Sequence, residues 1–183
     1  MNQEHQLRIS VEAISSDVRA CLGPGGLSNT LIVFGENAAL VVDTQLTPEL
    51  ALQVKAVASE ISGKPARYVL NTHGDTDHIF GNQQFWPESV LMCHRLTRER
   101  LLLQDAQTLI NHAIRQRPHL RSELKQVRLV IPELTFDGDV AFDLGGLEVR
   151  CLFVGPAHTT GDVVVWVPDR GVLFSSDLVF NRI

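Results

Sequence analysis

The sequence predicts an α/β protein, and three observations carry this prediction. First, residues 30–34 and 38–43 are almost continuously apolar, which is typical of strands that are buried on both faces of a sheet. Second, a helix pattern separates them from the next strand, residues 68–72, and a strand–helix–strand order usually joins parallel strands. Third, side chains that can bind a cation follow that strand directly, where ligands collect in such folds.

Strands and turns are expected before this unit. Residues 7–13 and Val18–Leu22 have strand patterns, and the two apolar strands of the first paragraph form a hairpin across Gly35-Glu36-Asn37. The run Gly23-Pro24-Gly25-Gly26 lacks the Lys-Ser/Thr of a phosphate-binding loop and opens no helix. We therefore interpret this run as a glycine turn, of the kind that often flanks an active cleft.

The first helix has clear signals at both ends. Thr47 is a suitable N-cap, Pro48 fits the first helical position, and Glu49 places an acid against the helix dipole. Gly63 and Pro65 end the pattern. One face carries apolar residues at helical spacing, and we expect it to be buried: Leu50, Val54, Val57, Ala58 and Ile61.

Four potential metal ligands lie within six residues, His73-Gly74-Asp75-Thr76-Asp77-His78. Two carboxylates this close repel one another, and burying them unpaired would be costly. A divalent cation removes this conflict, so the density of ligand-type residues predicts a metal site. The alternative is a polar loop that holds two histidines for no chemical reason.

The middle of the chain is predicted to be mostly helical. A short helix over residues 79–86 precedes a strand over residues 89–93 that ends at His94. One longer helix is expected over residues 97–116, with a buried side formed by Leu102, Ala106, Leu109, Ile110 and Ala113. The basic stretch 115–128 is interpreted as a solvated face, with a lid that favours anionic substrates as the alternative.

The last part of the chain is predicted to form strands only. The strands span residues 135–136, 140–144, 147–154, Val163–Val167 and 172–175. Two more ligand-type residues stand at turns between or after these strands, His158 and Asp177. We expect both to join the histidine–aspartate turn.

Length, composition and net charge exclude several classes of protein. The 183 residues fit one domain, 1–183, and 44% hydrophobic with 20% charged residues is ordinary globular usage. A net charge of −5 argues against a nucleic-acid partner, and no apolar stretch approaches the roughly 18 residues that span a bilayer. The start shows no secretory signal, and Cys21, Cys93 and Cys151 are isolated. We interpret the cysteines as buried small hydrophobes of a cytoplasmic protein, with a metal contact by one of them as the alternative.

These motifs together resemble the metallo-β-lactamase superfamily, whose signature is His-x-His-x-Asp-His with a later His, Asp and His. The matching residues are His73, Asp77, His78, His158 and Asp177. Further similarity lies in three short segments, Val41-Val42-Asp43-Thr44, Gly81-Asn82 and residues 158–162. The resemblance covers residues 18–180 and implies a four-layer αβ/βα sandwich with a metal site at the sheet edge.

Two positions depart from the family pattern. Asp75 stands where the family has its second histidine, and the last family histidine has no counterpart before Ile183. We therefore expect a C-terminally incomplete version of this fold.

The resemblance also implies a ligand set. By analogy, His73, Asp75 and His158 hold one metal, Asp77 and His78 belong to a second position, and Asp177 bridges the two. Such a site holds one or two zinc ions, with iron or manganese as alternatives. A metal-bound hydroxide then attacks the substrate, with Asp77 as the catalytic residue that orients it or accepts its proton. For His94 two roles remain open, a substrate-binding residue or a helix start.

The function expected from this resemblance is a metal-dependent hydrolase of an ester, thioester, lactone or lactam bond. The partner would be a small-molecule substrate, with no nucleic acid and no membrane, and an oligomer is compatible with the sequence. The first alternative is a non-haem iron oxidoreductase of the dioxygenase or flavodiiron type. Asp75 motivates it, because two histidines and one carboxylate are a ligand set of non-haem iron. The second alternative is a binding module with an incomplete metal site.

Overall fold

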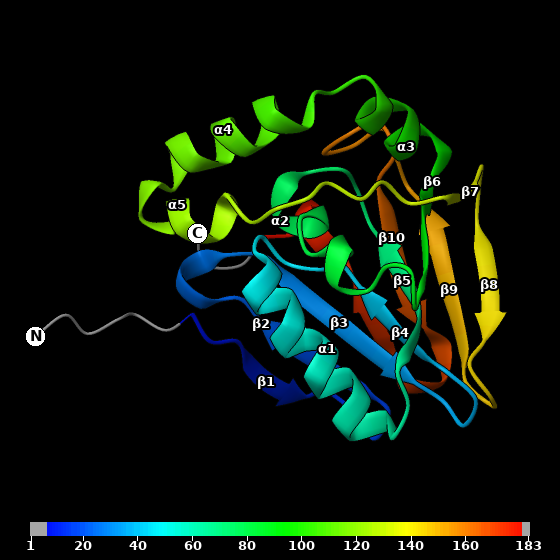
Figure 1. Ribbon diagram of the computed structural model, residues 1–183. Coiled ribbons are helices and arrows are strands. Elements are labelled where there is room, and N and C mark those ends of the chain that lie inside the picture. The colour runs from blue at the N-terminus through cyan, green and yellow to red at the C-terminus, as the bar shows by residue number, and fades with distance from the viewer. Residues whose placement is uncertain (1–6, 181–183) are drawn as a thin grey trace, which may run out of the picture.

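The computed structural model describes residues 7–180, and its largest element is a seven-stranded sheet (Figure 1). Its strands follow one another in chain order and pair antiparallel from β1 to β4 and parallel from β4 to β7. The carboxyl ends of β4, β5 and β6 therefore meet at one edge of the sheet. The strands are β1 (Ser10–Ala13), β2 (Val18–Leu22), β3 (Asn29–Phe34), β4 (Ala39–Val42), β5 (Ala66–Asn71), β6 (Val90–His94) and β7 (Leu134–Phe136).

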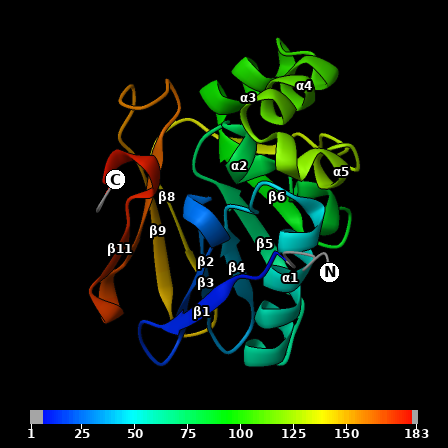
Figure 2. The ribbon, with the colours of Figure 1, turned by 90° about the vertical axis from the view of Figure 1, so that its left-hand side faces the viewer.

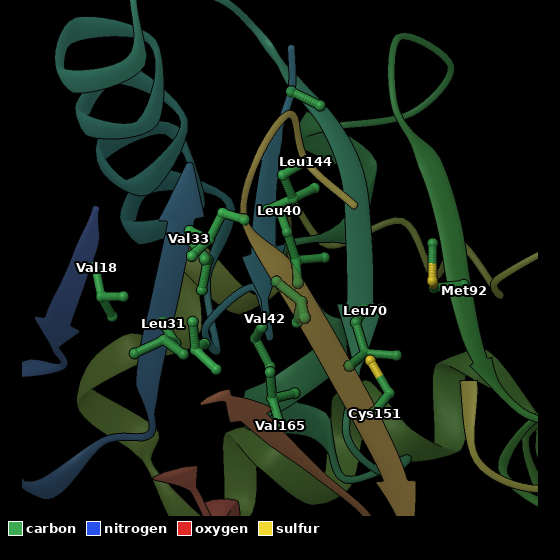
Figure 3. Close-up of a cluster of buried hydrophobic side chains, with 14 of the residues drawn as sticks. Val18, Leu31, Val33, Leu40, Val42, Leu70, Met92, Leu144, Cys151 and Val165 are labelled. Atoms are coloured by element: carbon green, nitrogen blue, oxygen red, sulfur yellow. The ribbon is translucent and has the colours of Figure 1, made fainter. Parts of the chain in front are cut away.

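A second, antiparallel sheet packs face to face on the first. Its order is β11-β10-β9-β8, formed by β8 (Val140–Asp143), β9 (Glu148–Phe153), β10 (Val163–Val167) and β11 (Val172–Phe174). Alternate residues of both sheets fill the space between them (Figure 3). Leu40 and Val42 of the first sheet, for example, share this core with Cys151 and Val165 of the second.

The opposite face of the seven-stranded sheet is covered by α1 (Pro48–Ser62). Val41 of β4 points into this second core, where it packs with Val54 and Ala58 of the helix. The predicted helix ends are confirmed: the Thr47 hydroxyl accepts a hydrogen bond from the Leu50 amide at 3.3 Å, and Gly63 ends the helix at φ 66°. Strand β4 is thus buried on both faces, as its continuous apolar sequence predicts.

The remaining helices lie beyond the carboxyl edge of the parallel strands, around a third core. They are α2 (Thr76–Ile79), η2 (Asn82–Gln84), α3 (Arg95–Leu102), α4 (Ala106–Gln116), η3 (Pro118–Leu120) and α5 (Arg121–Leu124). Three further 3₁₀ turns are η1 (Pro24–Gly26), η4 (Pro168–Arg170) and η5 (Ser176–Leu178). Figure 2 shows α1, α4 and α5 on the side of the first sheet that faces away from the second sheet. The α/β class and the two packed sheets are confirmed.

Two helix predictions were wrong in detail. The expected helix 97–116 is two helices, because the carboxylate of Asp105 accepts a hydrogen bond from the Thr108 amide at 2.7 Å and starts α4 afresh. Leu102, expected on the buried side, is 55% exposed for the same reason. The helix expected over residues 79–86 does not form as such: α2 spans Thr76–Ile79, so that Asp77 and His78 are helical, and only the 3₁₀ turn η2 follows it.

The three cysteines are confirmed as buried small hydrophobes. Cys21, Cys93 and Cys151 are free thiols, and burial raises the pKa of each to about 12. Among residues 7–180, no helix combines the length and the apolar character that a membrane crossing requires.

Candidate metal centre

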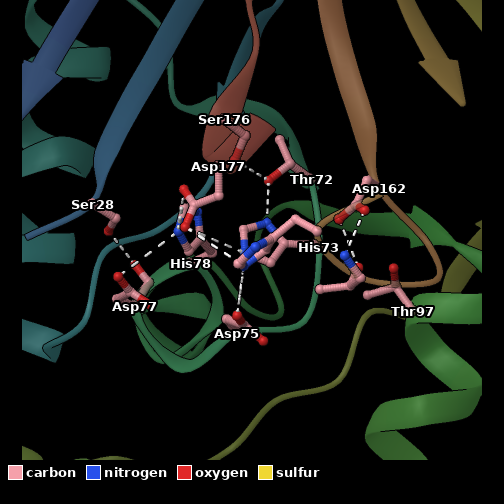
Figure 4. A network of polar contacts seen from close by, with 12 residues as sticks. Ser28, Thr72, His73, Asp75, Asp77, His78, Thr97, Asp162, Ser176 and Asp177 are labelled. Carbon is pink, nitrogen blue, oxygen red and sulfur yellow. Dashed lines mark hydrogen bonds and ion pairs between the residues drawn. The ribbon is translucent and has the colours of Figure 1, made fainter. Parts of the chain in front are cut away.

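The candidate site lies where β4 and β5 end, and Figure 4 shows the polar side chains that gather there. Unusual backbone conformations border it. Asp43, Gln45 and Ser176 all have positive φ angles, 65°, 70° and 50°. Such conformations cost about 1–3 kcal/mol each in residues other than glycine and are concentrated at functional sites. Asp43 and Gln45 follow β4, and Ser176 follows β11, so both sheets contribute strained turns to the same place.

Asp43 is the buried anchor of this region. One carboxylate oxygen accepts a hydrogen bond from the Thr72 amide at 2.8 Å. The other accepts from the Thr72 hydroxyl at 2.8 Å and lies 2.8 Å from His78 Nδ1. Its side chain is fully buried, so these contacts with strand β5 and helix α2 replace its hydration.

The hydrogen bonds around His73 determine which ring nitrogen carries its proton. The Thr72 hydroxyl has one proton and donates it to Asp43, so it accepts from His73 Nδ1, 3.0 Å away. Nε2 of His73 is then an unprotonated acceptor, and it is buried without a hydrogen-bond partner. Burial, followed by the charge of His78, lowers the pKa of His73 and favours the neutral imidazole that binds metals.

The ring of His78 is also held through its Nδ1 atom. Its Nδ1 donates to Asp43, and its buried Nε2 lies 3.2 Å from Oδ1 of Asp177 and 3.9 Å from Oδ2 of Asp77. Burial alone would lower the pKa of His78, but the Asp43 charge and the hydrogen bonds to Asp177 and Asp43 outweigh it. They hold the pKa of His78 well above its usual value. A positive charge, whether a proton or a metal ion, is therefore favoured between His78 and Asp177.

Asp177 lies between the two buried imidazoles. Its Oδ2 is 4.0 Å from His73 Nε2 and 3.8 Å from His158 Nε2, while its Oδ1 faces His78. Burial alone would raise the pKa of Asp177. The hydrogen bond with His78 and the charge of His78 lower it by more, so the pKa of Asp177 lies below its usual value. This carboxylate is thus a charged group at the centre of the site.

His158 reaches the site from the turn between β9 and β10. Asp162 shapes that turn, because its carboxylate accepts from the Thr159 amide at 2.6 Å and from the Thr159 hydroxyl at 2.7 Å. The His158 ring lies edge-on to His73, with centroids 5.1 Å apart. Asp162 is itself buried, so the turn has one fixed shape that directs His158 toward His73.

Asp75 and Asp77 complete the set from the turn that follows β5. Oδ2 of Asp75 is 3.1 Å from His158 Nε2 and 3.7 Å from His73 Nε2. The carbonyl of Asp77 accepts a hydrogen bond from the Ser28 hydroxyl, which comes from the loop after η1. The glycine turn therefore does flank the site, as its position in the sequence predicts.

These side chains fit a divalent metal ion. Donor atoms of His73, His158 and Asp177 lie within 4.8 Å of one another. The unprotonated, buried Nε2 of His73 faces carboxylate oxygens of Asp75 and Asp177, 3.7 and 4.0 Å away, an arrangement that is unfavourable without a cation among them. Imidazole and carboxylate donors suit zinc, iron and manganese.

All six residues predicted as ligands thus lie in one region, although their roles remain predictions. His94 has other contacts: its Nδ1 accepts from the Leu96 amide at 3.3 Å, and its ring stacks on that of Phe153 with the centroids 4.0 Å apart. This is the helix-start position that the sequence left as an alternative. The basic residues Arg115 and Arg121 are exposed, which fits a solvated face.

Sequence reasoning missed the supporting residues Thr72, Ser176 and Arg100. Asp43 was noted only as part of a strand end that resembles a family. A polar residue directly after a fully apolar strand was the available signal for Asp43. Nothing local in the sequence indicates Arg100, whose partner Asp75 lies 25 residues earlier.

The sequence of this chain matches one protein family and several characterised proteins. A family model described as "Metallo-beta-lactamase superfamily" matches residues 23–183. A protein of Nocardioides sp. (strain JS1661), "2,4-dinitroanisole O-demethylase subunit alpha", is 26% identical over 159 residues, which cover 85% of this chain and 42% of that protein. "Metallo-beta-lactamase type 2" of Bacteroides fragilis is 34% identical over 50 residues, 27% of this chain and 20% of that protein. The matched segments therefore cover less than half the length of either relative.

Solved structures share the fold. A metallo-beta-lactamase from Pontibacter korlensis has a TM-score of 0.69 at 22% identity, covering 92% of this chain and 71% of that chain. A metallo-beta-lactamase from Hirschia baltica has a TM-score of 0.64 at 17% identity, covering 92% and 70%. At these identities the likeness shows the fold alone, and this chain is shorter than the proteins it resembles.

Proposed function

This chain belongs to the metallo-beta-lactamase superfamily, and from that premise we propose that it is a metal-dependent hydrolase of a small-molecule substrate. The observation that carries the proposal is the arrangement of two buried imidazoles around the carboxylate of Asp177: Nε2 of His73 has no hydrogen-bond partner, and Nε2 of His78 lies 3.2 Å from Oδ1 of Asp177. Buried polar atoms without partners are rare in folded proteins and call for a specific explanation. A bound cation supplies it.

We propose the following division of the ligands. His73, His158 and Asp75 would hold one metal position, and His78 with Asp77 would belong to a second. Asp177 would serve both, which agrees with its place between His73 and His78. Zinc is the proposed metal, as one or two ions per chain.

When bound, zinc lowers the pKa of a coordinated water to about 7 and polarises the oxygen of the bond that is attacked. The residues of the chain do the rest. Asp77 is the proposed catalytic residue: its side chain is 23% exposed at the edge of the site, where it can accept the proton of an attacking water. Asp43 keeps the Nδ1 proton of His78 in place throughout, because their hydrogen bond is buried.

An ester, thioester, lactone or lactam is the proposed substrate bond. The name of the Nocardioides relative makes 2,4-dinitroanisole a further compound to test.

A non-haem iron oxidoreductase is the second candidate. Its support is the donor set of His73, His158 and Asp177, since two histidines and one carboxylate form the facial triad of non-haem iron enzymes. The metal that the protein acquires distinguishes the two candidates.

A cytoplasmic location is also proposed. Its support is the three free, buried cysteines, since unpaired thiols are typical of proteins from reducing compartments.

The test is metal analysis of protein purified without added metal, followed by hydrolysis assays with one compound of each bond class. We expect about one or two zinc ions per chain, and loss of both metal and hydrolysis in His73→Ala and His158→Ala. His112→Ala is the matched control, because His112 is an exposed histidine of α4. Iron with oxidase activity would favour the second candidate. Full metal occupancy in both ligand variants would overturn the assignment.

A further inference from the structure

The carboxylate of Asp75 has two different partners. Oδ2 faces the imidazoles of His73 and His158, while Oδ1 lies 3.1 Å from Nη2 of Arg100. We infer that Arg100 neutralises Asp75 and keeps it as a one-oxygen ligand, and that Arg100 thereby sets the metal affinity of the first position. This inference rests on the proposed function, since it requires that the site holds a metal.

Arg100 is held beside the site by the packing of its helix, α3. The Thr97 hydroxyl donates to the Gly161 carbonyl at 3.0 Å, and a Cβ added to Gly161 would lie 2.3 Å from that hydroxyl. On the other side, a Cβ added to Gly74 would lie 3.3 Å from Leu101. Helix α3 therefore packs against both loops that carry the ligands, the turn with Asp75 and the turn with His158.

The ion pair between Arg100 and Asp75 changes the net charge of the candidate metal site. An aspartate in place of a neutral imidazole adds one negative charge to a region that already holds Asp77 and Asp177. A guanidinium is always protonated, so the pair of Asp75 and Arg100 is neutral as a whole, as a histidine would be. The two oxygens of Asp75 contact different partners, Arg100 and His158. Bidentate coordination of one metal ion by Asp75 is therefore disfavoured while Arg100 is in place.

The two charges also act on the ion itself. Arg100 repels a dication that Asp75 attracts, so its removal leaves a more anionic site. Both side chains are partly exposed, 39% for Arg100 and 34% for Asp75, and solvent moderates the effect. The arginine thus weakens and restricts binding, and a variant without it should bind a dication more tightly.

The experiment is a chelator competition that measures zinc affinity in the metal-free full chain and its variants. For Arg100→Gln we expect zinc binding about fivefold tighter, since a partly screened unit charge acts on a dication. Arg100→Lys keeps the charge and should stay close to the unsubstituted chain. Arg95→Gln is the matched control: Arg95 lies on the same helix but pairs with Glu99 and Asp137.

A double-mutant cycle that combines Arg100→Gln with Asp75→His tests whether Arg100 changes zinc affinity through the carboxylate of Asp75. In the Asp75→His background Arg100→Gln should change zinc affinity less than about twofold, because the carboxylate that holds the guanidinium beside the ion is gone. Unchanged or weaker zinc binding in Arg100→Gln, or an equal effect in both backgrounds, would overturn the inference while leaving the proposed function intact. An unsubstituted chain that binds no zinc, iron or manganese would instead overturn the proposed function, and this inference with it.

Discussion

Oδ2 of Asp43 lies 2.8 Å from Nδ1 of His78, with both side chains buried between the end of β4 and helix α2. This hydrogen bond sets the tautomer of His78 and turns its Nε2 toward Asp177. A second partner that holds the far nitrogen of a metal-binding histidine is a common feature of metal sites. Here the same carboxylate also holds the Thr72 amide, so one side chain organises the strand end and the imidazole together.

Replacing Asp43 by asparagine should be strongly destabilising. Asparagine tolerates the positive φ of this position, so the change removes the charge without straining the backbone. An amide cannot accept all the donors that the carboxylate accepts, and we expect a loss of about 3 kcal/mol in the free energy of unfolding. Urea unfolding measures it. Asp169→Asn, at an exposed carboxylate, is the control and should stay within about 0.5 kcal/mol.

Gly81 is required by close packing and not by its backbone angles. Its φ is −81°, which any residue adopts, but an added Cβ would lie 1.9 Å from the Thr44 carbonyl and 2.5 Å from Cβ of Ala51. Gly81→Ala should therefore lower the free energy of unfolding by about 3 kcal/mol or more. At Gly138 a Cβ would meet nothing within 4 Å, so Gly138→Ala should be nearly neutral. Equal unfolding midpoints for the two variants would contradict this account.

Asp162 should matter for metal binding although it contacts no metal ligand. It fixes the turn that carries His158 through its bonds to Thr159. Asp162→Asn loses one of these acceptors, and we expect zinc affinity to fall about tenfold, as is usual for groups that orient ligands. Asp143→Asn is the control, because Asp143 accepts from the Gly145 amide at the opposite end of β9 from the His158 turn. A tenfold loss in both variants would point to a general loosening of the second sheet.

The ion pair between Asp17 and Arg170 predicts a pH dependence of stability. The Ser16 hydroxyl lowers the pKa of Asp17, burial opposes it, and Arg170 lowers it further, with a net pKa below the usual value. The carboxylate therefore stabilises the fold above the pKa of the unfolded chain, about 4, and this contribution disappears as pH falls through the lower folded value. Arg170→Gln should cost about 0.5 kcal/mol at pH 7 and less at pH 3, measured by urea unfolding. A difference that is constant with pH would contradict the assignment.

The sequence was sufficient for the elements whose signals are local. The apolar run of β4 and the Thr47 cap of α1 were predicted correctly, because each depends on neighbours in the chain. The candidate ligands of the β5 turn were found in the same way. The break between α3 and α4 was missed because apolar spacing continues through Leu102 and Leu103, while the Asp105 cap was overlooked. Arg100 and Ser176 could not be assigned at all. Their partners lie 25 and 104 residues away, and only the packing of α3 and of the second sheet brings them together.

The candidate ligands are divided between the two sheets. His73 to His78 follow β5 of the seven-stranded sheet, whereas His158 and Asp177 follow β9 and β11 of the four-stranded sheet. An ion held by all of them would join the two layers as a non-covalent cross-link, and the unfolded chain would lose it. At a hundredfold excess over its dissociation constant, such an ion adds about 2.7 kcal/mol to the free energy of unfolding. For a chain of this length that raises the melting temperature by about 5–10 °C. Heat alone, with and without a chelator, can therefore report occupancy of the site before any substrate is known.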